Sequence, residues 1–297
     1  MFIKLHEPTR YQQFLLAAEH RTALNDYDRH QLFNYLRGQE GERYFYELVK
    51  TSAGVKLWDI SLDYRKGSQY DFLIFDKRIV YHFDVKNFTG SYKLVNQQFV
   101  SQQGYVHADV LSQLNKAHYK LEEFLKSQLI QMKVVSRVLF VNHQYELPDA
   151  HVPDKVLLPH QVQEVVQYIH TIRPSQEHVT IADKIKACHR NELVKERIHY
   201  YAFEDYRQGI RCEQCRQLSM IPDCKKRYIS CINCRYRVDN KTALLALIKE
   251  MFLLKNDALS AAEVSRWSGI PQQTVRRIMA DLCHTSGANK NRQYILK

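Results

Sequence analysis

Apolar positions recur along the chain with two different periods, and the changes of period divide it into elements. Over residues 10–50 the period is close to 3.6 residues, which predicts helices. Shorter runs rich in β-branched and aromatic residues follow and predict strands. The elements expected after residue 50 are strands over 56–62, 70–75 and 79–85, a helix over 111–131, a strand over 134–142 and helices within 160–200. Their order up to the strand over 134–142 is typical of a mixed α/β unit.

The strands over 70–75 and 79–85 are predicted to form a hairpin. A two-residue turn at Asp76 and Lys77 would pair Phe75 with Arg78, whereas a four-residue loop would place Asp71 opposite Asp84. Both registers assign the side chains to the same faces, because side chains alternate along a strand. One face then carries Gln69, Asp71, His82, Asp84 and Lys86, and the other carries Tyr70, Phe72, Ile74, Tyr81, Phe83 and Val85.

The polar face of this hairpin brings two carboxylates and an amine together. Asp71 and Asp84 at such short range repel each other unless a cation lies between them, and their oxygens suit Mg²⁺ or Mn²⁺. Lys86 shares the face and could orient an attacking water, so the chemistry indicated is phosphodiester hydrolysis. The alternative interpretation is a solvent-facing strand pair in which Asp84 and Lys86 form a salt bridge.

Three short motifs around these residues resemble the nuclease-related domain, NERD, of the PD-(D/E)xK nuclease superfamily. They are Gly41-Glu42 on a helix, Gln69-x-Asp71, and the string Asp84-Val-Lys-Asn-Phe-Thr-Gly90. The resemblance covers about residues 40–145. It implies a restriction-endonuclease-like fold, in which helices flank a mixed sheet.

The resemblance also implies roles for individual residues. Asp71 and Asp84 would be ligands of a catalytic Mg²⁺ or Mn²⁺, Lys86 would be the catalytic lysine, and Glu42 would be a helix-borne acid near the metal. Glu47 competes with Glu42 for that role, but it does not follow a glycine. Gln113 matches loosely a glutamine that the superfamily often carries. The chain departs from the family pattern in having Asp84 where glutamate is usual and Phe72 where histidine is common.

Charge is distributed unevenly over the 297 residues. The formal net charge is +11, and residues 201–297 hold 17 Lys and Arg against 9 Asp and Glu. A basic last third favours a polyanionic partner such as nucleic acid. No segment reads as a signal peptide or a membrane span, and an odd number of cysteines, seven, favours a reducing compartment. A cytoplasmic protein without a membrane partner is therefore expected.

Four of the cysteines have the spacing of a structural zinc site. Cys212, Cys215, Cys231 and Cys234 form a CxxC–x15–CxxC pattern, which predicts a zinc ribbon that holds one Zn²⁺. Lys225, Lys226 and Arg227 lie between the two pairs. The basic residues around the cysteines are interleaved with Tyr228 and Tyr236, a combination that suits phosphate contact and base stacking. The alternative is a basic face that only makes the ribbon soluble.

The last 57 residues are predicted to form three helices and a strand pair. Ser260 and Glu263 have capping-box form before a helix over 261–268, and Gly269 ends that helix. A third helix over 272–282 presents Gln273, Arg276 and Arg277, and residues 285–296 suit a wing. The pattern resembles a winged helix, whose third helix would read the major groove. A winged helix used for protein contacts or domain packing is the alternative.

These features together predict a metal-dependent nuclease that acts on nucleic acid, with DNA expected in preference to RNA, and that is docked by two basic modules. A non-catalytic DNA-binding or regulatory protein on a nuclease-like scaffold, and a protein-interaction adaptor, are the competing hypotheses. The expected segments are an N-terminal helical region over 1–40, a nuclease domain over 41–145, a helical connection over 146–205, the zinc ribbon over 206–240 and the winged-helix-like part over 241–297.

Overall fold

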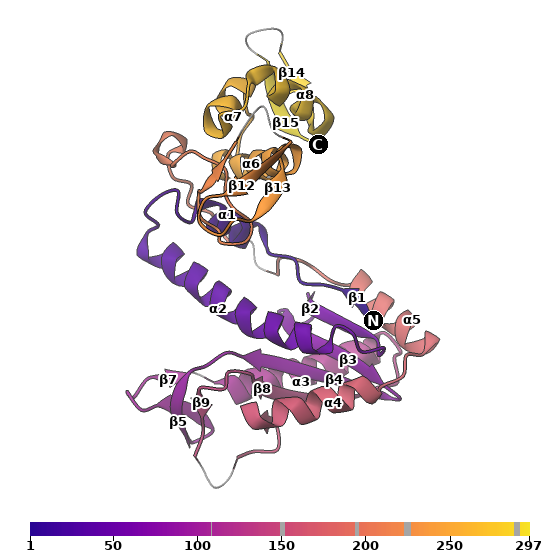
Figure 1. Ribbon diagram of the computed structural model, residues 1–297. Coiled ribbons are helices and arrows are strands. Elements are labelled where there is room, and N and C mark those ends of the chain that lie inside the picture. Colours follow the sequence, from indigo (N-terminus) through magenta and orange to yellow (C-terminus); the bar gives the residue numbers. More distant parts are fainter. Residues whose placement is uncertain (108, 149–151, 194–195, 223–226, 288–291) are drawn as a thin grey trace. The chain divides into compact units, whose positions relative to one another are not determined.

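The chain folds into two compact units, each of which combines an N-terminal and a C-terminal part of the sequence. A computed structural model describes residues 1–107, 109–148, 152–193, 196–222, 227–287 and 292–297 (Figure 1). Unit 1 comprises residues 1–9 and 33–195, and unit 2 comprises residues 10–32 and 196–297. Helix α2 (Asp26–Val49) contributes its first turns to unit 2 and the rest to unit 1. The finer five-part division expected from the sequence stays a prediction.

A mixed six-stranded sheet forms the centre of unit 1. Its order is β1-β2-β3-β4-β8-β10, with antiparallel pairing of β3 to β2 and β4 and parallel pairing elsewhere. The strands are β1 (Phe2–Lys4), β2 (Lys56–Leu62), β3 (Ser68–Asp76), β4 (Ile79–Lys86), β8 (Lys133–Phe140) and β10 (Val156–Leu157). The predicted mixed α/β architecture is thereby confirmed for this part of the chain.

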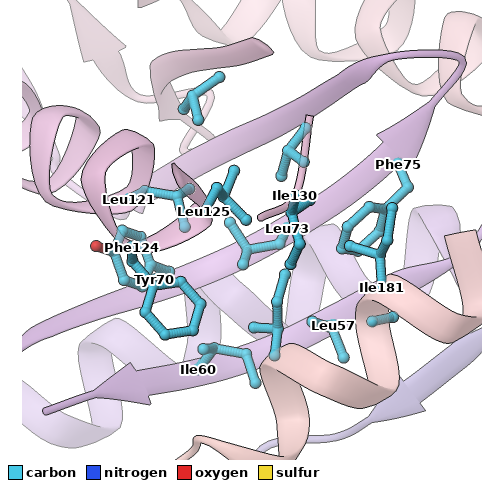
Figure 2. Packing of buried hydrophobic residues seen from close by; sticks show 14 of the residues in the cluster. Leu57, Ile60, Tyr70, Leu73, Phe75, Leu121, Phe124, Leu125, Ile130 and Ile181 are labelled. Atoms are coloured by element: carbon cyan, nitrogen blue, oxygen red, sulfur yellow. The ribbon is translucent and has the colours of Figure 1, made fainter. Parts of the chain in front are cut away.

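Helices cover both faces of the sheet. On one face α3 (Val110–Ser127) and α5 (Gln176–Ala187) enclose a core with Leu73 and Phe75 of β3 (Figure 2). On the other face α2 and α4 (Val162–Thr171), which follows a 3₁₀ turn (Pro159–Gln161), enclose a second core with Phe72 and Ile74. The strands therefore alternate between two buried faces, and the hairpin carboxylates lie in a sheet that has helices on either side.

A small second sheet follows directly after β4. Its order is β7-β6-β5-β9, and its strands are β5 (Gly90–Val95), β6 (Gln98–Ser101), β7 (Val106–His107) and β9 (Tyr145–Glu146). Phe99 and Tyr145 of this sheet pack against Phe140 of β8, and Tyr92 packs against Tyr145, in a third apolar cluster. The sequence pattern predicts none of these four strands, because each run is only two to six residues long.

Unit 2 contains the four-cysteine segment and the C-terminal helices. Its elements are α1 (Arg10–Ala18), a 3₁₀ turn (Phe203–Asp205), β11 (Met220–Ile221), β12 (Tyr228–Cys231), β13 (Arg237–Asp239), α6 (Asn240–Lys255), α7 (Ala261–Ser268), α8 (Gln272–Leu282), β14 (Cys283–Ser286) and β15 (Gln293–Leu296). Strands β11, β12 and β13 form one antiparallel sheet, and β14 pairs with β15.

A buried arginine connects the parts of unit 2. Arg21 follows α1 and is fully buried, and its guanidinium donates to Glu250 of α6 at 2.6 Å. It also donates to the carbonyl oxygens of Arg207 and Gly209 at 2.8 and 3.0 Å and lies 5.0 Å from the ring centroid of Trp267. Burial of a guanidinium is costly unless it is paired, so these contacts fix α1 against the C-terminal elements.

Local signals predicted the C-terminal helices well. The capping box of Ser260 and Glu263 is present, and Gly269 ends α7 with a φ of +71°. Elsewhere two expectations are wrong: the helix expected over 111–131 ends at Ser127, and within 160–200 the helices end at Ala187. Among the described residues no helix has the length and apolar character needed to cross a membrane.

Candidate active site and cysteine cluster

The β3–β4 hairpin has the register that places the two predicted metal ligands opposite each other. Asp76 pairs with Ile79, so the turn consists of Lys77 and Arg78, and the predicted turn at Asp76 and Lys77 is wrong by one residue. The pairing of Phe75 with Val80 gives the alternative register that the sequence had left open.

The regular hydrogen-bond ladder between β3 and β4 ends just before Asp71 and Asp84. The last regular pair on this side is Phe72 with Phe83, so the next position places Asp71 opposite Asp84. There the Asp71 carboxylate accepts the backbone N–H of Val85 at 2.8 Å. The side chain thus takes the place of a strand-to-strand backbone bond, which fixes the carboxylate at the edge of the hairpin.

The alternation of side chains breaks at this point, so one facial assignment made from the sequence is wrong. Tyr70 was expected beside Phe72, but it packs with Leu73 on the α3 side of the sheet (Figure 2). Its hydroxyl donates to the carbonyl oxygen of Ala117 at 3.2 Å. Because Tyr70 and Leu73 share a face three residues apart, Asp71 lies at an irregularity of β3.

Lys86 forms an ion pair with Asp84. Its ammonium lies 2.8 Å from Asp84 Oδ1, and the side chains are 22% and 16% exposed, which leaves both accessible to a ligand. Burial acts to lower the pKa of Lys86, but the carboxylates of Asp84, Asp71 and Glu42 outweigh it and raise the pKa. Lys86 is therefore a charged hydrogen-bond donor at neutral pH.

Burial and two nearby carboxylates disfavour the ionised form of Asp71. Burial, followed by the neighbouring carboxylates of Glu42 and Asp84, raises the pKa of Asp71 well above its ordinary value. Lys86 and the backbone N–H of Val85 act in the opposite direction but do not compensate. A cation beside Asp71 would act against both effects, since an opposite charge favours the ionised form.

Glu42 faces the same site from α2. Trp58 Nε1 donates to its Oε2 at 2.7 Å. Burial raises the pKa of Glu42 to about 7, although the Trp58 bond lowers it. Glu47, the alternative candidate for the helix-borne acid, is exposed and forms an ion pair with Lys50 on the surface of the helix.

The glycine before Glu42 permits a close approach of α2 to the end of β4. A Cβ on Gly41 would lie 2.7 Å from the Cβ of Asn87. Asn87 in turn donates to the carbonyl oxygen of Arg37 at 2.9 Å and accepts from Asn142 at 2.8 Å. Arg37 Nε returns a bond to the carbonyl oxygen of Asn87 at 3.0 Å. These bonds fix Glu42 relative to the strand that carries Asp84.

A second buried carboxylate, which the sequence did not single out, lies on β2. Asp59 has a φ of +62° and lies between the pairs Trp58–Phe72 and Ile60–Tyr70, which places it next to Asp71. His6 Nδ1 lies 2.8 Å from its Oδ2, Gln69 donates to its Oδ1 at 2.9 Å, and Lys4 is 3.8 Å away. The sequence could have suggested Asp59 only as an acidic residue between Trp58 and Ile60 in a predicted strand.

Two other residues named from the sequence lie outside this arrangement. Gln113 is exposed on the first turn of α3. His82 pairs with Leu73 on the α3 side of the sheet, where the face is an apolar core rather than the expected polar one. It is buried there, with Nδ1 3.2 Å from Ser136 Oγ. Burial lowers the pKa of His82 to about 4, so it is neutral at physiological pH.

Comparison with known proteins identifies the part of the chain that holds this site. Residues 37–141 match the family model described as NERD, nuclease-related domain. Those residues form a nuclease-related domain. The match contains Glu42, Asp71, Asp84 and Lys86 and is close to the range expected from the motifs. No curated protein and no solved structure matches the chain significantly.

Outside the nuclease-related domain, the four predicted cysteines come together in unit 2. All four Sγ atoms lie within 4.8 Å of one another, with 3.5 Å between Cys212 and Cys234 and between Cys215 and Cys231. These separations exceed a disulfide bond and suit thiolates around one tetrahedral ion such as Zn²⁺. The cluster could therefore bind a metal.

The two CxxC turns of this cluster have the same backbone form. The N–H of Arg216 bonds to the carbonyl oxygen of Cys212 at 2.9 Å, and the N–H of Arg235 bonds to that of Cys231 at 3.0 Å. Both arginines have a φ near +60°, at 60° and 63°. This repetition aims two pairs of sulfurs at one point.

In the part of the chain that the structure describes, the cysteine cluster is the only group of three or more His, Cys, Asp or Glu ligand atoms that are mutually this close. The carboxylates of the nuclease-related domain are thus spaced more widely. Magnesium ions in proteins commonly use one or two carboxylates and keep several waters, so wider spacing is compatible with that ion.

The residues predicted to contact nucleic acid all belong to unit 2. Arg227, Gln273, Arg276 and Arg277 are exposed, and the last three lie on α8. Lys225 and Lys226 lie outside the described residues.

Proposed function

We propose that the protein is a metal-dependent nuclease that hydrolyses phosphodiester bonds of nucleic acid, with DNA as the preferred substrate. The observation that carries this proposal is the juxtaposition of Asp71, Asp84 and Lys86 within the nuclease-related domain. When ionised, the carboxylates of Glu42, Asp71 and Asp84 carry more negative charge than Lys86 offsets. A divalent cation would balance the remainder. The raised pKa of Asp71, which is caused first by burial and then by Glu42 and Asp84, supports that need.

The donor set of the site fits Mg²⁺ or Mn²⁺. Asp71 and Asp84 offer hard oxygen ligands, and the partial exposure of Asp84 leaves room for water and a phosphate oxygen. A cation bound there would lower the pKa of a water molecule and offset negative charge on the phosphate. The Zn²⁺ expected at the cysteine cluster would instead serve structure, because four thiolates leave no open position.

The chain's own groups have distinct parts in such a reaction. Lys86 is held in its charged form by Asp84, so it would donate a hydrogen bond to the attacking water or to a phosphate oxygen rather than act as a base. Glu42 has a pKa of about 7 because it is buried, and a carboxylate with a pKa near the working pH suits proton transfer from water.

Unit 2 would hold the substrate. Its share of the charge is strongly positive, and Arg276 and Arg277 project from the exposed side of α8. A winged-helix use of α8 in the major groove, and a zinc ribbon that docks on the backbone, are consistent with these exposed basic residues. A non-catalytic DNA-binding or regulatory protein on a nuclease-like scaffold is the second candidate, favoured by the same basic surface.

A cleavage panel tests the proposal. Purified protein is incubated with linear, circular and single-stranded DNA and with RNA, with and without Mg²⁺ or Mn²⁺. Asp84→Ala and Lys86→Ala should each abolish metal-dependent cleavage while gel shifts on the same substrates persist. Glu47→Ala is the matched control on α2 and should cleave normally, since Glu47 is exposed. Cleavage that survives EDTA or both site variants would refute the proposal, and salt-dependent shifts without any cleavage would favour the binder.

A further inference from the structure

One face of the small sheet in the four-cysteine segment carries exposed apolar and basic side chains. Along β12 the residues alternate, with Tyr228 and Ser230 exposed and Ile229 and Cys231 buried. The buried face thus belongs to the cysteine cluster. The other face is solvent-accessible, and Tyr228 on it is 38% exposed.

The strand register shows which side chains share this exposed face. Ile221 of β11 pairs with Ser230, and Ser230 pairs with Arg237 of β13. Residues paired across antiparallel strands point to the same side, so these three form a row across the sheet next to Tyr228. Ile221 is 60% exposed, which is unusual for isoleucine in a strand.

Two guanidinium groups gather on the tyrosine ring. Arg237 Cζ lies 4.5 Å from the ring centroid of Tyr228, and Arg227 Cζ lies 5.5 Å from it. Within the described part of the chain neither arginine forms a salt bridge. Asp239, which pairs with Tyr228, is instead engaged as the cap of α6, where it accepts the N–H of Thr242 at 3.0 Å. The positive charge on this face is therefore available to a ligand.

The side chains of this face suit a nucleic acid that has both phosphate groups and unpaired bases. Two arginines held on an aromatic ring bind phosphate groups well, because guanidinium is weakly hydrated and forms paired hydrogen bonds. Tyr228 beside the two arginines and Ile221 on the neighbouring strand offer an exposed apolar surface on which an unpaired base can stack. In a duplex the faces of the bases are already covered by their neighbours, so a duplex can use the charges but not this apolar surface.

We propose that the face formed by Ile221, Tyr228, Ser230 and Arg237, with Arg227 at its edge, binds single-stranded nucleic acid. The inference rests on the proposed function for its partner class and deepens it by naming the strand state. Unit 2 would then deliver unpaired segments, such as ends or gaps, in addition to whatever α8 binds.

Binding without cleavage tests this proposal. The full chain carrying Asp84→Ala is loaded with zinc and titrated, without added magnesium, into a fluorescein-labelled oligothymidylate and into a duplex of the same length. Anisotropy should show that Tyr228→Ala weakens single-strand binding about tenfold, the order of effect expected for one lost stacked base. Duplex affinity should change by less than twofold, and Tyr228→Phe, which keeps the ring, should bind both DNAs like the parent.

Replacement of an arginine should change the salt dependence of binding. Arg237→Ala should reduce the slope of log affinity against log salt by about 0.7 for the single strand, because one phosphate contact is lost. Arg237→Lys should retain most of that slope. Tyr119→Ala, which removes an exposed tyrosine of α3 in unit 1, is the control and should have no effect.

Zinc content and circular dichroism check that each variant is folded. If the alanine variant loses its zinc, Tyr228→Leu replaces it as the test. Leucine keeps an apolar side chain without the aromatic ring, so this variant should also weaken single-strand binding. Equal losses on both DNAs, or no loss on either, overturn the proposal. Cleavage by the chain with intact Asp84, together with Tyr228-independent binding, would overturn this proposal alone. Tyr228-dependent binding without any cleavage would overturn only the proposed nuclease.

Discussion

The close contact between Gly41 and Asn87 makes α2 unusually sensitive to one methyl group. An alanine at this position would place its Cβ 2.7 Å from Asn87 Cβ and 3.3 Å from Val141 Cγ2. Carbon atoms at 2.7 Å overlap, so either the helix or the end of β4 must move. Because Glu42 is the next residue, that movement would displace its carboxylate relative to Asp84.

Gly38 of the same helix provides a matched control. A Cβ there would meet nothing within 4 Å, so Gly38→Ala should gain the helix propensity of alanine, about 1 kcal/mol. Gly41→Ala gains the same propensity but incurs an overpacking cost of about 1–3 kcal/mol. The two variants should therefore differ in free energy of unfolding by about 1–3 kcal/mol, with Gly41→Ala the less stable.

Urea unfolding followed by circular dichroism measures this difference, and hydrogen exchange of peptides spanning residues 33–50 and 79–90 localises it. Gly41→Ala should also lower metal-dependent cleavage, whereas Gly38→Ala should not. If Gly41→Ala is stabilised as much as Gly38→Ala and exchanges normally around Asn87, α2 does not approach β4 as described. The positioning of Glu42 by that contact would then be refuted.

Three further outcomes are expected. Trp58→Phe removes the hydrogen bond that lowers the pKa of Glu42, so the acid limb of the cleavage pH profile should move to higher pH; an unchanged profile would contradict the role of Glu42. Asp59→Asn removes a buried charge that His6 contacts and should cost about 3 kcal/mol at pH 7 in urea unfolding. Because the pKa of Asp59 is lowered in the folded protein, its contribution is complete above the ordinary pKa and is lost as the pH falls through the folded value, so the difference between the two proteins should shrink toward pH 3. Cys215→Ser should reduce bound zinc, measured by plasma mass spectrometry, and a full equivalent of zinc in the variant would exclude the cysteine cluster as its site.

Elements whose ends are marked by local chemistry could be predicted from the sequence closely. Strand β2 has the bounds expected from its apolar run, and α7 and α8 begin and end at their predicted residues. A capping box and a left-handed glycine are properties of a few neighbouring residues, so no tertiary information is required to find them. The cysteine spacing likewise anticipated a cluster that the fold then assembles.

Features that depend on several strands at once could not be predicted. The broken alternation at Asp71 occurs beside Asp59, whose own positive φ interrupts β2, so two adjacent irregularities support each other. Strict alternation therefore misplaced Tyr70. The contact of His6 with Asp59 could not be predicted either, because it depends on the pairing of β1 with β2 across more than fifty residues of sequence.

Asp59 and Asp71 lie next to each other in the sheet, but their surroundings shift their pKa values in opposite directions. The two carboxylates lie on paired strands, and burial by itself acts to raise the pKa of each. Bonds from His6 and Gln69 and the charge of Lys4 outweigh burial at Asp59, so its pKa is lowered and its charge is already compensated. Asp71 has instead two carboxylates among its strongest neighbours, and its pKa is raised. Three partners offset burial at Asp59, whereas at Asp71 burial and two carboxylates outweigh Lys86 and the N–H of Val85. The cation that we propose beside Asp71 would supply the positive charge that this carboxylate lacks.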